Sequence, residues 1–335
     1  MHHSTLALFL TVFVPLAVRG DDKPPLRAGI IGLDTSHVVA FTQLLHNPKA
    51  TGILSRVRVV AAYPGGSADI PDSRNRVEGF TKTLREKFGV EIVDSIDDLL
   101  KKVDVVFLES VDGQPHLEQV KPVFRAKRPV FIDKPVAGSL ADAVEIYRLA
   151  KESGTPCFSS SSLRFSPGIR GVRSDPKFGA VLGCDAYGPC SLEPHHPDLF
   201  WYGIHGIETL FTIMGPGCEA VTRTTTENAE FVTGKWKDGR IGTYRGIRKG
   251  KTGYGATVFG KEMIGPSGRY EGYEPLLVEI CKFFESGEAP VTAEETLEIY
   301  AFMEAADESK RQGGKPVTLA SVLARARKSV GAKRR

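Results

Sequence analysis

Several features are missing from this 335-residue chain. No apolar run reaches the roughly 18 residues that a membrane-spanning helix needs, so we expect no membrane span. The five cysteines do not have zinc-site spacing, and their odd number leaves at least one thiol unpaired. Cys184 and Cys190 could pair in an oxidising compartment, but buried small hydrophobic residues are the favoured interpretation of all five.

The formal charge of +4 is concentrated at the chain ends. Without Arg19 and the six basic residues among the last eleven positions, 37 basic side chains remain against 40 acidic ones. A nucleic-acid-binding protein needs a basic face, so no nucleic-acid partner is expected. The basic tail 321–335 is predicted to be a frayed, solvated end.

The first twenty residues have the pattern of a secretory signal peptide. The segment 5–18 is apolar except at Thr11 and Pro15, and small residues precede Asp21. The residues before the apolar segment include no Lys or Arg, which is atypical, and a buried structural segment is the alternative. We expect residues 1–20 to be a signal peptide and the protein to be exported, to the periplasm or outside the cell.

Residues 21–158 alternate between strand and helix patterns. Leu26–Gly32 and Val57–Tyr63 have the composition of buried strands and begin about thirty residues apart, the length of one βαβ unit. Val103–Leu108 and Pro129–Ile132 are further apolar runs, with a helical pattern between them. Apolar strands that alternate with helices predict a doubly wound parallel sheet, hence an α/β fold.

Helix boundaries are also marked in this first half. Ser139, followed by Asp142, has the pattern of an N-terminal capping box, and Gly89 and Gly154 each follow a helical pattern. These residues predict where two of the crossover helices end and where one begins.

Residues 159–320 have a different pattern, typical of an α+β domain with a mostly antiparallel open sheet. Helical patterns return at 273–286 and 293–311. The strand candidates, which Gly and charged turns separate, are 180–188, 217–226, 229–236, 240–247 and 254–260.

The turn after the first strand is where doubly wound folds bind a dinucleotide pyrophosphate. The usual G-x-G-x-x-G fingerprint is reduced here to Gly32–His37, GLDTSH, which keeps only the first glycine. Asp34 replaces the second glycine, where a carboxylate would repel phosphate or cap the helix itself. The second strand ends at Tyr63 without an acid for a ribose hydroxyl. These residues leave open dinucleotide binding or a fold that has lost its cofactor.

Six motifs stand in an order known from one family. They are Ala28–Gly32, Val103–Val106 with Pro115-His116 behind it, Phe131–Pro135 (FIDKP), Arg164–Pro167, Gly203–Glu208 and the segment 290–317. In this order the chain resembles the Gfo/Idh/MocA oxidoreductases, relatives of glucose–fructose oxidoreductase and inositol dehydrogenase. FIDKP is similar to the E-K-P motif of that family, with Asp in place of Glu. The resemblance implies a Rossmann-like domain over 21–158 and a substrate or oligomerisation domain over 159–320.

The resemblance also implies a reaction. It points to hydride transfer between a sugar, cyclitol or related polyol and a tightly held NAD or NADP, with redox-assisted glycoside cleavage as a related option. Lys134 would ease the formation of alkoxide character, and His205 would be the general base, because imidazole titrates near neutral pH. Trp201 stands where the family often has Asp, and Tyr202 is a candidate for that missing group.

The remaining candidate residues follow mainly from their positions: the turn after the first strand, the carboxyl edge of the sheet, where open α/β sheets bind ligands, and the polar loop 193–198. The cofactor-binding candidates are Gly32, Asp34, Thr35, Ser36, His37, Glu109, His116 and Lys134, and the substrate candidates are Arg164, His195, His196 and Tyr202. Each has an ordinary structural alternative: a surface turn for Lys134, a core histidine for His205 and an ion pair for Arg164.

Two other functions stay open. A carbohydrate-binding protein without cofactor is favoured by Asp34, His37 and Tyr63. A metal-assisted hydrolase or isomerase would use the His-rich loop 193–198, but no fixed ligand spacing supports it, and we predict no metal site. The open sheet is compatible with a homo-oligomer by analogy alone.

Overall fold

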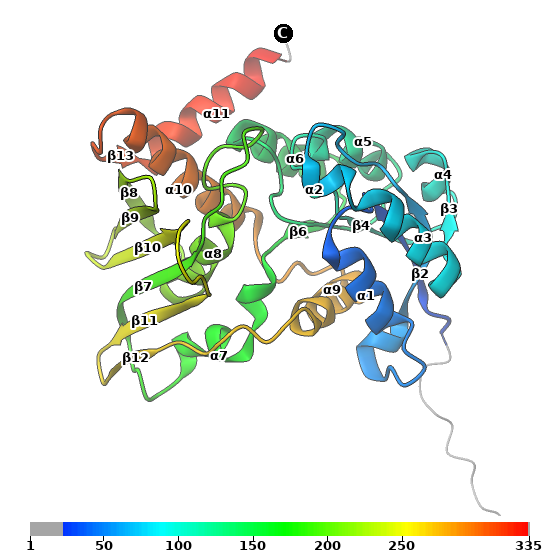
Figure 1. Ribbon diagram of the computed structural model, residues 1–335, viewed down its shortest axis with the longest axis horizontal. Helices are drawn as coiled ribbons and strands as arrows, with labels where there is room; N and C mark the ends of the chain where they lie inside the picture. Colours follow the sequence, from blue (N-terminus) through cyan, green and yellow to red (C-terminus); the bar gives the residue numbers. More distant parts are fainter. Residues whose placement is uncertain (1–22, 334–335) are drawn as a thin grey trace, which may run out of the picture.

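A computed structural model describes residues 23–333, so the predicted signal peptide lies outside the described residues. Two sheets stand at opposite ends of the molecule, with helices between them (Figure 1). Among the described residues, no helix is both long and apolar enough to cross a membrane.

The first sheet has six parallel strands in the order β3-β2-β1-β4-β5-β6. Growth of the sheet reverses direction between β1 and β4, which confirms the doubly wound prediction. Its strands are β1 Leu26–Ile31, β2 Val57–Tyr63, β3 Glu91–Ile92, β4 Val105–Leu108, β5 Val130–Ile132 and β6 Cys157–Ser159.

Helices cover both faces of this sheet, as a parallel sheet requires. One face carries α1 and α3, and the other carries α4, α5 and α6. The helices of this half are α1 Ser36–Leu45, α2 Pro71–Arg74, α3 Val77–Phe88, α4 Ile96–Leu100, α5 His116–Arg125 and α6 Leu140–Ser153, with a 3₁₀ turn at Gly52–Arg56.

The predicted helix boundaries are confirmed. The Ser139 hydroxyl accepts a hydrogen bond from Asp142 N–H at 3.1 Å and donates to the Asp142 carboxylate at 2.9 Å. Gly89 and Gly154 adopt φ of 67° and 65°, the left-handed conformation that ends α3 and α6.

The second sheet has seven strands in the order β12-β11-β7-β10-β9-β8-β13. It is mostly antiparallel, as predicted, but β7 and β10 pair in parallel, which the sequence pattern does not indicate. The five predicted strands are present, and two short strands are added. The strands are β7 Val181–Pro189, β8 Cys218–Thr225, β9 Ala229–Trp236, β10 Ile241–Ile247, β11 Gly255–Gly260, β12 Ile264–Pro266 and β13 Val317–Thr318.

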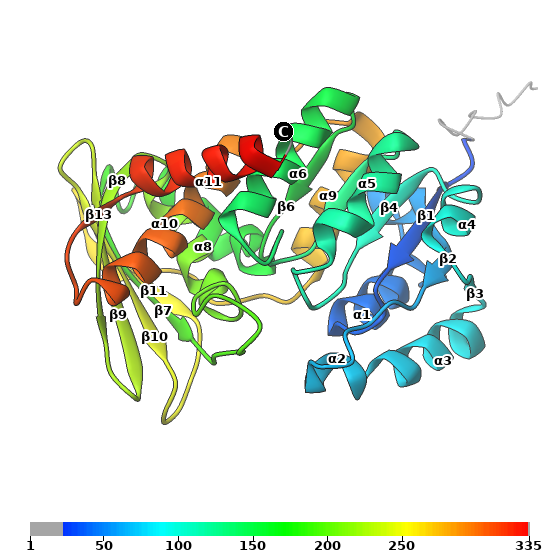
Figure 2. The ribbon, with the colours of Figure 1, turned by 90° about the horizontal axis from the view of Figure 1, so that it is seen from above.

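Helices α8 and α10 pack on the inner face of the second sheet (Figure 2). Chain segments between the sheets include 3₁₀ turns at Ser162–Phe165 and Gly171–Ser174. The helices of this half are α7 Pro167–Arg170, α8 Gly203–Met214, α9 Glu274–Ser286, α10 Ala293–Arg311 and α11 Leu319–Lys333.

Helix α9 packs away from its predicted domain. It lies against the first sheet beside α1 (Figure 1). Phe284 contacts Phe107 and Phe283 contacts Phe158, with ring centroids 5.0 Å apart in both pairs. The apolar face of α9 therefore completes the core of the first domain, although the chain has already entered the second.

The prediction of a frayed tail over 321–335 is wrong for residues 321–333, the part that the structure describes. This segment belongs to α11, which lies beside α6 and α10 (Figure 2). Val322, Ala326 and Val330 are buried at the i, i+4, i+8 spacing of one helix face. Arg325, Arg327 and Lys328 are exposed on the remaining surface of the helix, so a segment of basic composition forms an amphipathic helix.

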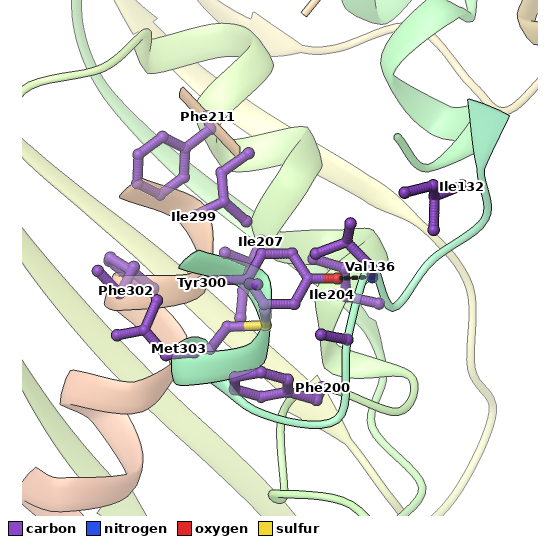
Figure 3. Close-up of a cluster of buried hydrophobic side chains, with 14 of the residues drawn as sticks. Ile132, Val136, Phe200, Ile204, Ile207, Phe211, Ile299, Tyr300, Phe302 and Met303 are labelled. Carbon is purple, nitrogen blue, oxygen red and sulfur yellow. Dashed lines mark hydrogen bonds between the residues drawn. The ribbon is translucent and has the colours of Figure 1, made fainter. Parts of the chain in front are cut away.

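The junction between the domains has an apolar core (Figure 3). Tyr300 of α10 is buried there, and its hydroxyl accepts a hydrogen bond from Val136 N–H at 2.5 Å. Ile204 and Ile207 of α8 pack in the same cluster. Helices of the second domain thereby hold the segment that follows β5.

All five cysteines are free and buried. The interpretation of these residues as small hydrophobic core residues is confirmed, and Cys184 and Cys190 do not pair.

Candidate functional site

A cavity of about 200 Å³ opens where the carboxyl ends of β4 and β5 meet the second domain. Ligands bind at this edge in open α/β sheets. The cavity brings together the first turn of α1, Lys134 after β5, and His205 on α8. Its aromatic wall consists of Trp201, Tyr202, Tyr254, Tyr270 and Tyr273.

The N-terminus of α1 faces this cavity through Thr35, Ser36 and His37. Thr35 is the N-cap residue in extended conformation, but no side chain caps the helix. The buried Thr35 hydroxyl has no hydrogen-bond partner among the described residues. A helix end of this kind, with its positive dipole, is suited to an anion.

Asp34 does not cap α1, so that expectation is wrong. Its carboxylate accepts hydrogen bonds from the Ser73 hydroxyl at 2.6 Å and from Val111 N–H at 2.8 Å. Burial raises the pKa of Asp34, and these hydrogen bonds only partly oppose the rise. The carboxylate therefore links the turn after β1 to α2 and to the loop after β4, and it does not cap the N-terminus of α1.

Lys134 follows Asp133, which is fully buried. Asp133 Oδ2 lies 2.9 Å from His37 Nδ1. Burial opposes ionisation of Asp133, but the contact with His37 and the charge of Lys134 outweigh it and lower the pKa of Asp133 to about 2. The Asp that replaces Glu in the FIDKP motif is thus paired with a histidine from the altered glycine fingerprint.

His205 lies on the buried helix α8, and its Nδ1 forms a 2.7 Å hydrogen bond with the Ser161 hydroxyl. Burial, reinforced by the nearby charge of Lys134, holds the pKa of His205 well below its usual value. The imidazole is therefore neutral at neutral pH and can accept a proton. The cavity does not bring a carboxylate to Nδ1; the serine occupies that place.

Ser161 is a site residue that sequence reasoning missed. Its backbone N–H donates to Glu208 at 2.8 Å, and the neighbouring Ser160 hydroxyl donates to the same carboxylate at 2.6 Å. The signal in the sequence is the serine run 159–162, which does not by itself indicate a role for any of its members. Tyr202, the predicted substitute for the missing Asp, lines the cavity and contacts the His205 ring at 5.9 Å between centroids.

Arg164 is placed in an ion-pair network. Its guanidinium donates to Glu208 at 2.6 Å and to Glu295 at 2.7 Å. Arg164 is not among the residues that line the cavity. The geometry matches the structural alternative stated for this residue.

His195 and His196 also lie outside the cavity. His195 is part-exposed and pairs with Asp69 at 3.1 Å, whereas the His196 side chain is buried and lies 3.2 Å from Asp112. These contacts join the loop 193–198 to loops of the first domain. Among residues 23–333, no group of three or more His, Cys, Asp or Glu side chains could hold a metal ion.

Three further cofactor candidates lie beneath the cavity. Gly32 has φ of 86°, and a Cβ there would lie 2.3 Å from the Ser110 hydroxyl oxygen. His116 is buried, with its Nε2 2.9 Å from the carbonyl of Ser110. Glu109 is fully buried, and its pKa is raised well above its usual value by burial and by the charge of Asp133. These residues shape and support the loops on which a ligand would rest.

The chain matches known proteins in sequence over part of its length. Residues 26–161 match GFO_IDH_MocA, an oxidoreductase family with an NAD-binding Rossmann fold. YceM of Salmonella typhimurium, named as an oxidoreductase, is 30% identical over 156 residues, or 45% of this chain and 50% of the relative. The 2,7-anhydro-N-acetylneuraminate hydratase of Mediterraneibacter gnavus is 25% identical over 161 residues, or 43% of this chain and 42% of the relative. The matches therefore span half or less of these two relatives.

Solved structures share the fold over nearly the whole described chain. The scyllo-inositol dehydrogenase of Lactobacillus casei, solved with NAD(H) and scyllo-inositol, has a TM-score of 0.71 and 15% identity, covering 88% of this chain and 99% of that chain. The myo-inositol 2-dehydrogenase of Lactobacillus plantarum has a TM-score of 0.71 and 17% identity, with the same coverage of 88% and 99%. At these identities the likeness establishes the fold.

Proposed function

We propose, from the premise that the chain is a divergent member of the Gfo/Idh/MocA oxidoreductase family, that it transfers a hydride between a polyol carbon and a tightly held NAD or NADP. The observation that carries the proposal is one cavity that combines an open helix N-terminus, the ammonium of Lys134 and the neutral imidazole of His205. Each of these groups serves a different part of such a reaction.

The residues present fit a nicotinamide dinucleotide, the cofactor that this family binds. The uncapped first turn of α1 and the unpartnered Thr35 hydroxyl suit a pyrophosphate. Asp34 is compatible with this arrangement, because hydrogen bonds to Ser73 and Val111 hold its carboxylate. Thr35 and Ser36 would hold the pyrophosphate, and the bound nicotinamide would supply the hydride-accepting carbon.

The aromatic wall supports a sugar or cyclitol as the substrate. Tyr202, Tyr254 and Tyr270 line the cavity, and a tyrosine side chain combines an apolar ring, which suits the C–H surface of a sugar, with a hydroxyl, which suits its polar edge. Burial raises the pKa of Tyr270 to about 12, so this hydroxyl keeps its proton and can donate a hydrogen bond at neutral pH. The solved relatives include enzymes that are named for scyllo- and myo-inositol.

His205 and Lys134 divide the proton chemistry of the proposed oxidation. A carbon can release a hydride only as its hydroxyl loses a proton. For Nε2 of His205 to take that proton, Nδ1 must carry the ring hydrogen and donate it to the Ser161 hydroxyl, which lies 2.7 Å away. The Lys134 ammonium would stabilise the negative charge that develops on the oxygen.

Export adds a condition to this proposal. If residues 1–20 direct secretion, free dinucleotide is scarce at the destination, and the cofactor must stay bound and be recycled within each catalytic cycle. Transient oxidation followed by elimination, as in redox-assisted glycoside cleavage, would meet this condition. The match to a hydratase that acts on an anhydrosugar supports keeping this option.

The outer face of the second sheet supports a homo-oligomer. Tyr187, Phe231 and Ile241 are large apolar side chains exposed on neighbouring strands of this face. We expect light scattering to give the mass of a dimer or larger assembly, and a monomer mass would contradict this expectation.

The proposed function is tested on the purified mature protein. We expect mass spectrometry of the denatured protein to detect NAD or NADP, and scyllo- or myo-inositol to reduce it, as followed by nicotinamide absorbance. Lys134→Met should lower turnover by roughly 10²–10⁴-fold at an unchanged melting temperature, while Lys82→Met, an exposed control on α3, should not. A protein that contains no dinucleotide and is not thermally stabilised by adding one would refute the proposal.

A further inference from the structure

The cavity contains a second imidazole that the proposed oxidation does not use. His37 lines the cavity from the first turn of α1, and it stands where the glycine fingerprint has its third glycine. Removal of one hydroxyl proton requires only one base, and His205 fills that role. His37 therefore needs a separate explanation.

Three contacts fix the His37 ring. Its Nδ1 lies 2.9 Å from Asp133 Oδ2. Its face stacks on Phe41 with centroids 5.2 Å apart and an interplanar angle of 10°. Tyr273 meets it edge-on at 4.6 Å. Nδ1 lies at ion-pair distance from the carboxylate, although the two groups do not have hydrogen-bond geometry, and Nε2 is the ring nitrogen on the other side.

This arrangement is the one that makes a histidine a good general base. A carboxylate at Nδ1 selects the tautomer whose Nε2 carries a lone pair, and it stabilises the imidazolium that forms after proton transfer. The side chains of His37 and Asp133 are 6% and 0% exposed, so solvent does not weaken this pairing. The other charged or titratable groups around the ring are Lys134, His205 and Tyr273.

We infer that His37 and Asp133 form a second acid–base pair in this cavity, which moves a proton between His37 Nε2 and a ligand carbon next to a ketone. The inference rests on the proposed function, because the ketone is the product of the proposed oxidation. Once a hydroxyl carbon has been oxidised, the hydrogen on the adjacent carbon is the acidic hydrogen that remains for a second base. The ligand class is a keto sugar or keto cyclitol.

The proton transfer balances without a further reagent. The C–H bond breaks, its electron pair forms the carbon–carbon double bond of an enolate, and the proton bonds to His37 Nε2. The carbonyl oxygen takes the negative charge, which the ammonium of Lys134, a cation that lines the cavity, can stabilise. Return of the proton reverses the step, and loss of a substituent from the next carbon would make it an elimination.

The test uses scyllo-inosose, the ketone of scyllo-inositol, and the holoprotein in D₂O. With the cofactor in its oxidised form no hydride can reach the ketone, so deuterium uptake measured by mass spectrometry reports this step alone. Wild-type protein should exchange the adjacent hydrogen faster than buffer, and His37→Gln should lose at least about a hundredfold of that rate. Asp133→Asn, which keeps the shape of the side chain, should lose roughly tenfold or more. His195→Gln is the matched control and should exchange at the wild-type rate.

A second measurement does not depend on the choice of ligand. Diethyl pyrocarbonate modifies neutral imidazoles, and peptide mass spectrometry gives a rate for each histidine. His37 should react in the folded protein, and Asp133→Asn should slow it at least several-fold while His195 keeps its rate as an internal reference. The inference would be overturned if wild-type protein caused no deuterium exchange. It would also be overturned if His37 were modified at the same rate in Asp133→Asn as in wild-type protein. Cofactor reduction by an inositol without exchange would overturn it and leave the proposed function standing.

Discussion

At the scale of single residues, Ser161 is the hydrogen-bond partner of His205 where an Asp was expected. Trp201 occupies the position at which an Asp was expected before His205, and it lines the cavity wall. The partner of His205 comes from the serine run between the domains. Ser161 reaches Nδ1 at 2.7 Å, and Glu208 fixes Ser161 through its backbone N–H. A hydroxyl held in this way orients an imidazole without adding a charge beside it.

The role of Ser161 as a positioning residue gives a first prediction. Ser161→Ala removes the hydrogen bond to Nδ1 and should lower kcat about tenfold, equivalent to about 1.4 kcal/mol, with KM little changed. Ser161→Thr restores the hydroxyl and should recover most of the loss. The measurement is kcat and KM of each variant with the inositol that reduces the cofactor. Equal losses in both variants, or a change in KM alone, would contradict a positioning role.

Asp112 gives a second prediction, on pH and stability. Burial opposes its ionisation, but hydrogen bonds from His196, Ser67 and Gln114 outweigh it and lower the pKa of Asp112 to about 2, from 3.8. A carboxyl with a lowered pKa stabilises the fold above its unfolded pKa and loses that contribution as pH falls toward 2. Asp112→Asn should therefore cost about 1 kcal/mol at pH 6, after allowance for solvent screening. Urea unfolding should show this difference shrinking between about pH 4 and pH 2, and a constant difference would count against it.

At the scale of elements, packing changes the meaning of local composition. The stretch 321–333 has the charge of a solvated end, yet every fourth position from Val322 to Val330 is apolar and buried in α11. Likewise, α9 follows the second sheet in the chain and packs on the first. In both cases the apolar face of a helix packs against elements that are distant from it in the sequence.

Helix α11 gives a third prediction. Val322→Ala should cost about 1–3 kcal/mol of unfolding free energy, because Val322 is 1% exposed against the neighbouring helices. Lys328→Ala, on the exposed face of the same helix, should change it by no more than about 0.5 kcal/mol. Chemical denaturation measures both. Equal, small effects would mean that this helix adds little to the folded domain.

At the scale of the whole molecule, the cavity exists because the second domain closes over the edge of the first sheet. His205 and the tyrosine wall come from the second domain, whereas Lys134 and the α1 terminus come from the first. A buried hydrogen bond joins the two domains close to the site. Tyr300 of α10 holds the backbone at Val136, two residues beyond Lys134 (Figure 3).

The fastening at Val136 gives a fourth prediction. Tyr300→Phe leaves a buried N–H without a partner and should cost about 1–3 kcal/mol of stability. It should also lower turnover, because the segment that carries Lys134 loses its anchor. Lys82→Met, the exposed control on α3, should be neutral in melting temperature and turnover. A stable but slower Tyr300→Phe enzyme would still support the link to Lys134, whereas unchanged turnover would contradict it.

The sequence by itself determined the repeating strand and helix units, the caps at Ser139, Gly89 and Gly154, and the placement of Lys134 after β5. The units and caps depend on the preferences of residues that are neighbours in the sequence. The placement of Lys134 follows because the carboxyl ends of parallel strands lie at one edge of the sheet. Only the tertiary structure decided that Asp34 turns away from the helix it precedes, that Ser161 meets His205, and that Asp133 meets His37. Each of these contacts joins residues tens of positions apart, and which polar groups meet depends on how buried donors and acceptors satisfy one another once the domains have packed.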